Sequence, residues 1–218
     1  MSHVTLAGCV CICVVLAAVP MFLMAQGPNT PNLGLIGNRF KPLTYDQLTP
    51  EQKTMAANLL NGPRKGMGGP FNVLLRSPVM GDLAAKFGEY GRFHSSIPQK
   101  LNEMAIIMTA RNWTAQYEWY AHKRAALQAG LSPAIVDAIA ANKRPSPMNP
   151  DEEIIYEFSN EILNTKHVSD ATLAAAVKRF GERGVVDLMS TIGWYQFVSM
   201  ILNVDGYPLP EGVKPELK

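Results

Sequence analysis

The chain has 218 residues, a formal net charge of +2 and 17% charged residues. This length suits one compact domain or a fused pair of small ones, and the composition excludes collagen-like, coiled-coil and highly charged disordered chains. The 20 basic and 18 acidic residues are spread along the chain without a Lys/Arg block. The sequence therefore gives no electrostatic footprint for nucleic acid, and we expect no nucleic-acid partner.

The N-terminal segment is strongly apolar. Residues 4–25 carry no formal charge, and the composition changes abruptly at Gln26-Gly27-Pro28-Asn29. We interpret residues 1–25 as a signal peptide or a membrane anchor, and a start at Met21 or Met24 is a third reading. We expect an exported protein, periplasmic or secreted, if the segment is cleaved. If it is not cleaved, this segment is the only part that we expect to contact a membrane.

All three cysteines, Cys9, Cys11 and Cys13, lie in this N-terminal segment. The rest of the chain therefore offers no disulfide, no cysteine-ligated zinc and no thiol nucleophile. No other histidine has metal-ligand spacing to the motif histidine discussed below, so we expect no metal site.

Helix signals dominate the remaining chain. Residues 26–44 are rich in Pro, Gly and Asn and predict an extended arm, and Thr49-Pro50-Glu51-Gln52 is a capping box that begins a helix. A glycine-rich loop covers residues 61–70, and a Pro-rich tail covers residues 207–218. Helices are predicted at about residues 50–60, 78–90, 98–110, 114–130 with Thr114 as the cap, a short one from 133, 150–164, 169–180 and 184–203.

No run of residues combines β-branched side chains with alternating polarity and turn dipeptides. The fold class is therefore all-α, without a sheet. Both halves of the chain end in a long apolar helix, which is compatible with a weak internal duplication. In the last helix, Gly193-Trp194-Tyr195 either allows close helix packing or lines a cavity.

Two polar residues lie on the apolar side of the predicted helix at residues 114–130. At 100° per residue, Glu118 and His122 fall in one stripe with Ala115, Trp119, Ala125, Ala126 and Ala129. Their spacing of four places the two side chains one turn apart, within reach of each other. The preceding helix is apolar almost all round, and Glu103 interrupts it on the side of Ile106, Ile107 and Ala110.

Glu103, Glu118 and His122 therefore point into apolar surroundings from two consecutive helices. Burying an uncompensated charge costs several kcal/mol, so they should pair with each other or face a wet cavity. Burial raises a carboxyl pKa and lowers an imidazole pKa, while a close carboxylate raises the latter, and opposed effects can leave a group poised for proton transfer. The alternative is a structural Glu118-His122 pair, with Glu103 bonded to a buried backbone end.

These residues resemble a known family. The stretch from Pro98 to Glu103, the apolar run to Ala110-Arg111, Tyr117-Glu118-Trp119-Tyr120-Ala121-His122 and Gly130-Leu131 are similar to the carboxymuconolactone decarboxylase family of the alkylhydroperoxidase-D-like superfamily. The similarity extends over about residues 45–206, which we take as one domain. The resemblance implies a helical bundle of that superfamily and a homo-oligomer, a trimer or hexamer.

The resemblance also assigns roles. Glu103 matches the glutamate and His122 the histidine of a proton relay, whereas Ala115 and Glu118 occupy the two cysteine positions of the thiol-dependent branch. Thiol peroxidase chemistry therefore does not carry over, and Glu118 resembles the decarboxylase-type branch. That branch implies loss of CO₂ from a lactone bearing a carboxylate, without a cofactor, with Glu103, Glu118 and His122 as catalytic residues.

A small carboxylate substrate also needs a cation. Arg64, Lys65, Arg76 and Arg111 are the candidates, and Arg64 in the glycine-rich loop is the first choice because loops on a helical framework commonly hold ligands. The plain alternative is a solvated Arg-Lys pair on a surface loop. Two other functions stay open: a different small-molecule reaction of a non-thiol superfamily member, or a non-catalytic oligomeric binding protein.

Overall fold

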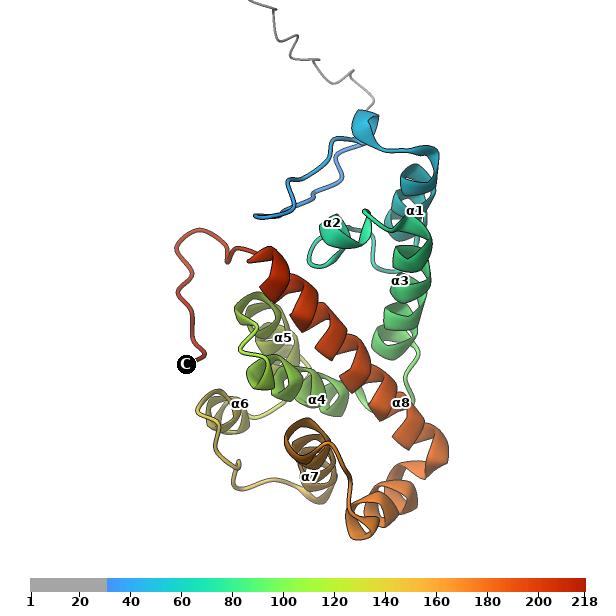
Figure 1. Cartoon of the computed structure of the whole chain (residues 1–218). Coiled ribbons are helices and arrows are strands. Elements are labelled where there is room, and N and C mark those ends of the chain that lie inside the picture. The colour runs from blue at the N-terminus through green and yellow to red at the C-terminus, as the bar shows by residue number, and fades with distance from the viewer. Residues whose placement is uncertain (1–30) are drawn as a thin grey trace, which may run out of the picture. The chain divides into compact units, whose positions relative to one another are not determined.

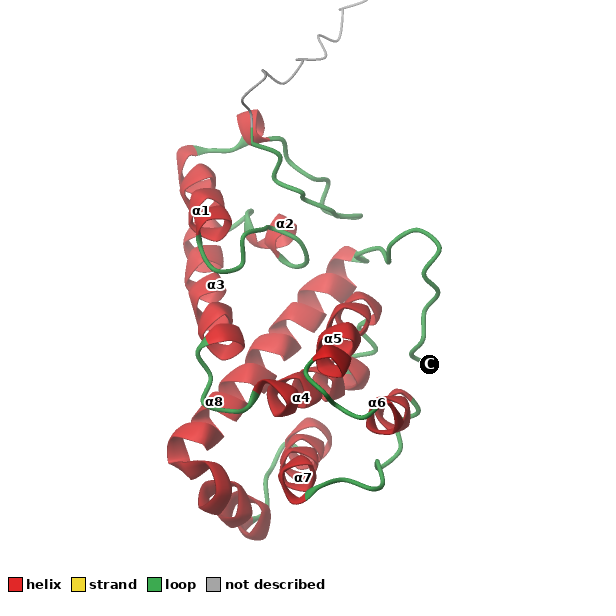
Figure 2. Cartoon of the chain, turned by 180° about the vertical axis from the view of Figure 1, so that it is seen from behind, coloured by secondary structure: helices red, strands yellow, loops and turns green. Residues whose placement is uncertain are grey.

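The computed structural model describes residues 31–218. The predicted signal or anchor at residues 1–25 and the first part of the arm, residues 26–30, lie outside the described residues. Within the described part, the chain forms helices and loops and no strand (Figures 1 and 2), so the all-α prediction is confirmed.

The helices follow one another with short connections. A 3-10 turn, η1, precedes them at Tyr45–Gln47. The α-helices are α1 (Pro50–Asn61), α2 (Phe71–Leu74), α3 (Pro78–Phe93), α4 (Gln99–Asn112), α5 (Gln116–Gln128), α6 (Pro133–Ala140), α7 (Pro150–Thr165) and α8 (Asp170–Asp205). The sequence did not predict α2, which is a single turn after the glycine-rich loop.

Local sequence chemistry determines most helix starts. The Thr49 hydroxyl accepts a hydrogen bond from the Gln52 amide, while the Gln52 side chain accepts one from the Thr49 amide at 2.9 Å, as the capping box predicts. Asn149 and Glu152 form the same reciprocal pair at the start of α7. In both helices a proline occupies the first helical position, where no amide hydrogen is needed.

The prediction that Thr114 caps its helix is wrong. The N-cap is Ala115, without a side-chain cap bond, and Thr114 has a left-handed backbone with φ of 49°. The reason is the tight turn between α4 and α5, in which the Ala115 amide donates to the Ala110 carbonyl at 2.9 Å. The two helices predicted after residue 169 meet directly in α8, at a kink where Gly181 has φ of 71°.

The core has two apolar clusters, and α8 contributes to both. Val185, Leu188 and Ile192 pack in the cluster that α4, α5, α6 and α7 build. Trp194 and the residues after it pack with α1, α2 and α3. Figures 1 and 2 both show α8 between these two groups of helices. Among the described residues, α8 is the one helix long and apolar enough to span a membrane, but most of its apolar window is buried in this core.

The arm and the tail are both fastened to the helices. Asp205, fully buried at the end of α8, accepts hydrogen bonds from the amides of Phe40 at 2.8 Å and Asn38 at 3.3 Å. At the other end of the chain, Glu216 accepts a bond from the Trp119 indole at 3.0 Å. The tail is therefore bonded to α5, the helix that carries Glu118 and His122.

Gly88 allows α3 to approach α8 closely. A Cβ at Gly88 would lie 2.2 Å from Cε2 of Trp194, whereas a Cβ at Gly193 would meet no described atom within 4 Å. Close packing therefore depends on Gly88 and not on Gly193. Of the two readings of Gly193-Trp194-Tyr195, the structure supports the second, because Trp194 and Tyr195 line a cavity.

We predict that Gly88→Ala lowers the free energy of unfolding by about 1–3 kcal/mol, because the added methyl group overpacks the contact with Trp194. The matched change Gly193→Ala should be neutral or raise it by up to about 1 kcal/mol, since alanine favours a helix over glycine. Urea unfolding of both variants checks this. Equal effects of the two changes would contradict the proposed close contact.

Candidate functional site

Helix α5 directs its polar pair inward, as its periodicity predicts. Glu118 is 4% exposed and His122 is 6% exposed, and both lie on the side of α5 that also buries Trp119 and Ala126. The opposite side presents Arg124 and Gln128 to solvent. The pair is therefore placed by the helical repeat, and the indole bond of Trp119 to the tail holds the helix in this rotation.

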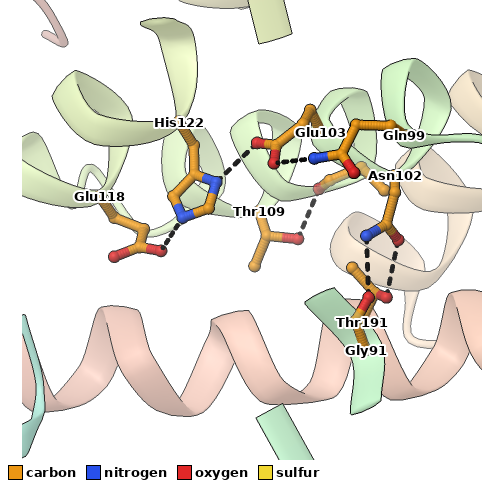
Figure 3. Close-up of polar contacts among 9 residues, drawn as sticks. Gly91, Gln99, Asn102, Glu103, Thr109, Glu118, His122 and Thr191 are labelled. Carbon is orange, nitrogen blue, oxygen red and sulfur yellow. Dashed lines mark hydrogen bonds and ion pairs between the residues drawn. The ribbon is translucent and has the colours of Figure 1, made fainter. Parts of the chain in front are cut away.

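His122 bridges the two carboxyl groups. Its Nδ1 lies 2.6 Å from Oε2 of Glu103, and its Nε2 lies 3.2 Å from Oε1 of Glu118. Figure 3 shows the imidazole between the two acids, with Glu103 also accepting a bond from the Gln99 amide at 3.2 Å. The structure thus brings together the three side chains that the sequence singled out.

Glu103 comes from the most buried helix, α4, and is only 1% exposed. Its neighbour Asn102 donates to the Gly91 carbonyl at 2.9 Å and accepts from the Thr191 hydroxyl at 2.8 Å (Figure 3). These bonds tie α4 to the end of α3 and to the middle of α8. The position of the Glu103 carboxyl is therefore held by contacts of α4 that do not involve His122.

A cavity of about 110 Å³ lies next to the cluster of Glu103, His122 and Glu118, which we call the relay. The glycine-rich loop, α3, α5 and α8 all contribute to its wall. Glu103 does not line it and lies behind His122. The polar residues that line the cavity are Arg64, Arg92, Tyr117, Glu118, His122 and Tyr195.

Arg64 carries an unpaired positive charge into the cavity. Its Nη2 is buried and has no hydrogen-bond partner among residues 31–218, and its guanidinium lies 4.9 Å from the ring centroid of Phe71. Burial lowers the pKa of this guanidinium, although an arginine keeps its charge at neutral pH. The buried nitrogen of this half-buried side chain lacks a partner, and a ligand carboxylate would supply one.

The other predicted cations are placed elsewhere. Arg76 donates to the carbonyls of Lys41 and Asn72 and so fastens the arm. Arg111 donates to the Ala140 carbonyl at 3.0 Å, and Lys65 is exposed to solvent. Arg64 is therefore the one of the four candidates that lines the cavity.

The cavity favours the protonated form of Glu118. Burial raises the pKa of the Glu118 carboxyl, and the nearby Glu103 carboxylate acts in the same direction. The positive charges of His122, Arg92 and Arg64 lower it but do not outweigh burial. Glu118 is therefore a weaker acid than an ordinary glutamate and lies 3.2 Å from the imidazole of His122, which is the arrangement of a candidate proton donor beside a base.

Sequence reasoning missed three polar residues of the cavity as candidates. Tyr117 lies next to Glu118 on α5 and was used only as part of the motif. Arg92 reaches the cavity from the last turn of α3, and Tyr195 reaches it from the middle of α8. Tyr195 had a signal, because the motif around it was noted as a cavity-lining candidate, but nothing in the sequence near Arg92 distinguishes it from a solvated arginine. Both are more than 20 residues away from the Glu118-His122 pair in the chain.

Comparison with protein-family models finds no match for this chain, and comparison with curated proteins finds none either. The resemblance described above therefore stays a prediction. The geometry of the relay and of the cavity is the basis for the functional proposal below.

We predict that ionisation of Glu118 destabilises the fold. Because its folded-state pKa lies above the ordinary value of 4.5, its contribution to stability is complete below pH 4.5 and is lost as the pH rises through the raised pKa. Relative to Glu118→Gln, the wild-type chain should therefore lose free energy of unfolding across that range. Chemical denaturation at a series of pH values measures the difference.

The matched control is Glu182→Gln, at an exposed position on α8. Its stability relative to wild type should not vary in the same way with pH. A Glu118→Gln variant whose stability follows the wild-type curve at every pH would show that the carboxyl is not desolvated in solution.

Proposed function

We propose that this protein is a cofactor-free acid/base enzyme of the carboxymuconolactone decarboxylase type, a carboxy-lyase-like enzyme that acts on a small carboxylate or lactone. The observation that carries the proposal is that His122, held by Glu103, meets Glu118 at the wall of a cavity into which Arg64 brings an unpaired charge. The acid/base pair Glu118-His122 and a group that can bind an anion, Arg64, thus line the same cavity.

Each residue has a separate role in the proposed reaction. Arg64 pairs with a carboxylate of the substrate and orients it. When the bond to the departing CO₂ breaks, its electron pair flows into the conjugated lactone. The resulting carbanion equivalent takes the proton shared by Glu118 and His122, and solvent returns a proton afterwards. Glu103 holds the imidazole at its Nδ1 and acts as a positioning residue.

Thiol peroxidase activity is not part of the proposal. Residues 26–218 contain no cysteine, and the positions of the two thiols are taken by Ala115, which is buried, and by Glu118. An alternative is a binding protein that keeps the relay as a structural cluster. The unpaired guanidinium beside the relay favours an enzyme or a ligand-binding site over a purely structural cluster.

We predict that His122→Gln and Glu118→Gln each reduce kcat by about 10²- to 10⁴-fold, the usual contribution of a positioned acid or base. The assay is CO₂ release from a panel of unsaturated lactone acids by the full-length protein. Arg64→Met should instead raise KM more than it lowers kcat, because it removes a binding contact.

The matched control is His94→Gln, which changes an exposed histidine outside the cavity and should leave turnover unchanged. Wild-type turnover that survives His122→Gln in a folded protein would remove the histidine from the mechanism. Binding of the acids without any turnover by the wild-type protein would favour the binding-protein alternative.

The proposal includes a homo-oligomer, a trimer or hexamer. On α3, apolar side chains at Val79, Leu83, Phe87 and Tyr90 are spaced by four, four and three residues and remain exposed, with Leu83 65% accessible. Such spacing is typical of helix packing. On α8, the exposed apolar residues Val186, Met189, Met200 and Val204 are spaced by three, eleven and four residues, which also places them on one side of a helix. Exposed apolar surface of this extent supports association with further copies of the chain.

We predict that the full-length protein has the mass of an oligomer in light scattering after size-exclusion chromatography, and that Leu83→Asp shifts it toward the monomer. Leu127→Asp changes an exposed apolar residue of α5 that lies outside the two proposed surfaces, so it is the matched control and should leave the mass unchanged. A monomeric wild-type protein would contradict this proposal but would leave the acid/base proposal standing.

We also propose export, or attachment to a membrane through residues 1–25. The support is the uncharged stretch at residues 4–25 and the absence of cysteine after it. A small-molecule enzyme without thiols needs no reducing compartment, so the relay is compatible with an oxidising environment.

A further inference from the structure

Tyr195 is a buried phenol at the wall of the cavity. It is 2% exposed, lies on α8 and lines the cavity together with Glu118 and Arg64. The edge of its ring meets the imidazole of His122, with ring centroids 4.7 Å apart and an interplanar angle of 73°. Its hydroxyl forms no hydrogen bond with any residue in the described range 31–218.

The surroundings of this phenol keep it neutral. Burial raises the pKa of Tyr195, and the negative charges of Glu118 and Glu103 raise it further. The positive charges of Arg92 and Arg64 oppose this effect, but the phenol remains the favoured form. Tyr195 thus keeps its proton and can donate it in a hydrogen bond.

Among residues 31–218, the fully enclosed side-chain oxygens and nitrogens without a partner belong to Arg64, Ser159 and Ser199, and the Tyr195 hydroxyl is not one of them. With no bond to the protein, this hydroxyl is therefore open to the cavity that Tyr195 lines. Both nitrogens of His122 already contact carboxyl oxygens, and the Tyr195 hydroxyl forms no hydrogen bond with Glu118 or Glu103. The other phenol of the cavity, Tyr117, packs against the ring of Tyr207 with centroids 4.3 Å apart. The unsatisfied donor of Tyr195 is therefore available to a molecule bound in the cavity.

We propose that Tyr195 is a further catalytic residue, which donates a hydrogen bond to a carbonyl or lactone oxygen of the ligand whose carboxylate pairs with Arg64. This inference rests on the proposed function and narrows it. The substrate class becomes small acids that carry a second, uncharged oxygen acceptor.

The chemical benefit follows from where charge develops. When the bond to CO₂ breaks, the electron pair moves onto the conjugated carbonyl oxygen, which becomes enolate-like. A donor already oriented at that oxygen stabilises the developing charge without reorganisation. Protonation of the carbon by the Glu118-His122 pair then restores the carbonyl, so Tyr195 keeps its own proton throughout.

The test compares two ligands with matched carboxylates. One probe is 5-oxotetrahydrofuran-2-carboxylate, which carries a lactone carbonyl but lacks the conjugated double bond that the proposed decarboxylation needs. The other is tetrahydrofuran-2-carboxylate, which lacks the carbonyl. Calorimetric titration of the full-length protein gives Kd for each. Tyr195→Phe should weaken binding of the lactone probe by about fivefold to tenfold, equivalent to one hydrogen bond, and should change binding of the second probe by less than twofold.

Two further variants complete the design. Arg64→Met should weaken both probes, since both carry the carboxylate. Tyr120→Phe, which removes a phenol that does not line the cavity, should affect neither probe. Thermal unfolding of Tyr195→Phe verifies that the fold is kept, and the ratio of the two Kd values is independent of any general loosening of the cavity.

An equal effect of Tyr195→Phe on the two probes, or no effect on either, would overturn the role of Tyr195. Failure of both probes to bind the wild-type protein would overturn the proposed ligand class together with it. The proposed function is judged separately, by turnover and by its loss in His122→Gln. A protein that discriminates the probes through Tyr195 but never turns over a lactone acid would keep the hydrogen bond from Tyr195 to the ligand, and would lose both the lyase proposal and the catalytic role of Tyr195.

Discussion

The hydrogen bond between Glu103 and His122 is the constraint on which the rest of the structure depends. Both groups are almost completely buried, and the two atoms are 2.6 Å apart. A carboxylate in an apolar interior costs several kcal/mol unless it is bonded. If α4 and α5 slid or rotated relative to each other, the Glu103–His122 bond would break and the buried carboxyl would lose its partner. One polar contact therefore fixes the register of the two helices around which the core is built.

The two apolar clusters meet near the polar contacts of Asn102 and Glu103 on α4. Asn102 and Thr191 join α4 to α8 there, and the kinked α8 carries residues of both clusters on either side. Gly88 lets Trp194 approach α3, and so sets the distance between α3 and α8 at the cavity wall. The cavity is therefore a consequence of how α3, α5 and α8 pack around His122 and its two carboxyl partners. The bond from Trp119 to Glu216 of the tail holds α5 in place.

The sequence allowed much of this to be predicted, because local rules govern helix starts and helix faces. The capping boxes at Thr49 and Asn149 and the inward direction of Glu118 and His122 follow from spacing alone. Thr114 was assigned wrongly because a tight turn, set by tertiary packing, moved the cap to Ala115. Arg92 could not be assigned to the cavity, and a cavity-lining role for Tyr195 was only one of two readings of its motif. Their convergence depends on how α3 and α8 pack in the folded chain, and no local pattern predicts that packing.

The electrostatics of the cavity link binding to proton transfer. The charges of Arg64 and Arg92 lower the pKa of Glu118 against the effect of burial. A bound carboxylate would pair with that positive charge and add a negative charge beside Glu118, and both changes raise the carboxyl pKa. Under the proposed function, the substrate therefore strengthens the hold of Glu118 on the proton that the reaction consumes.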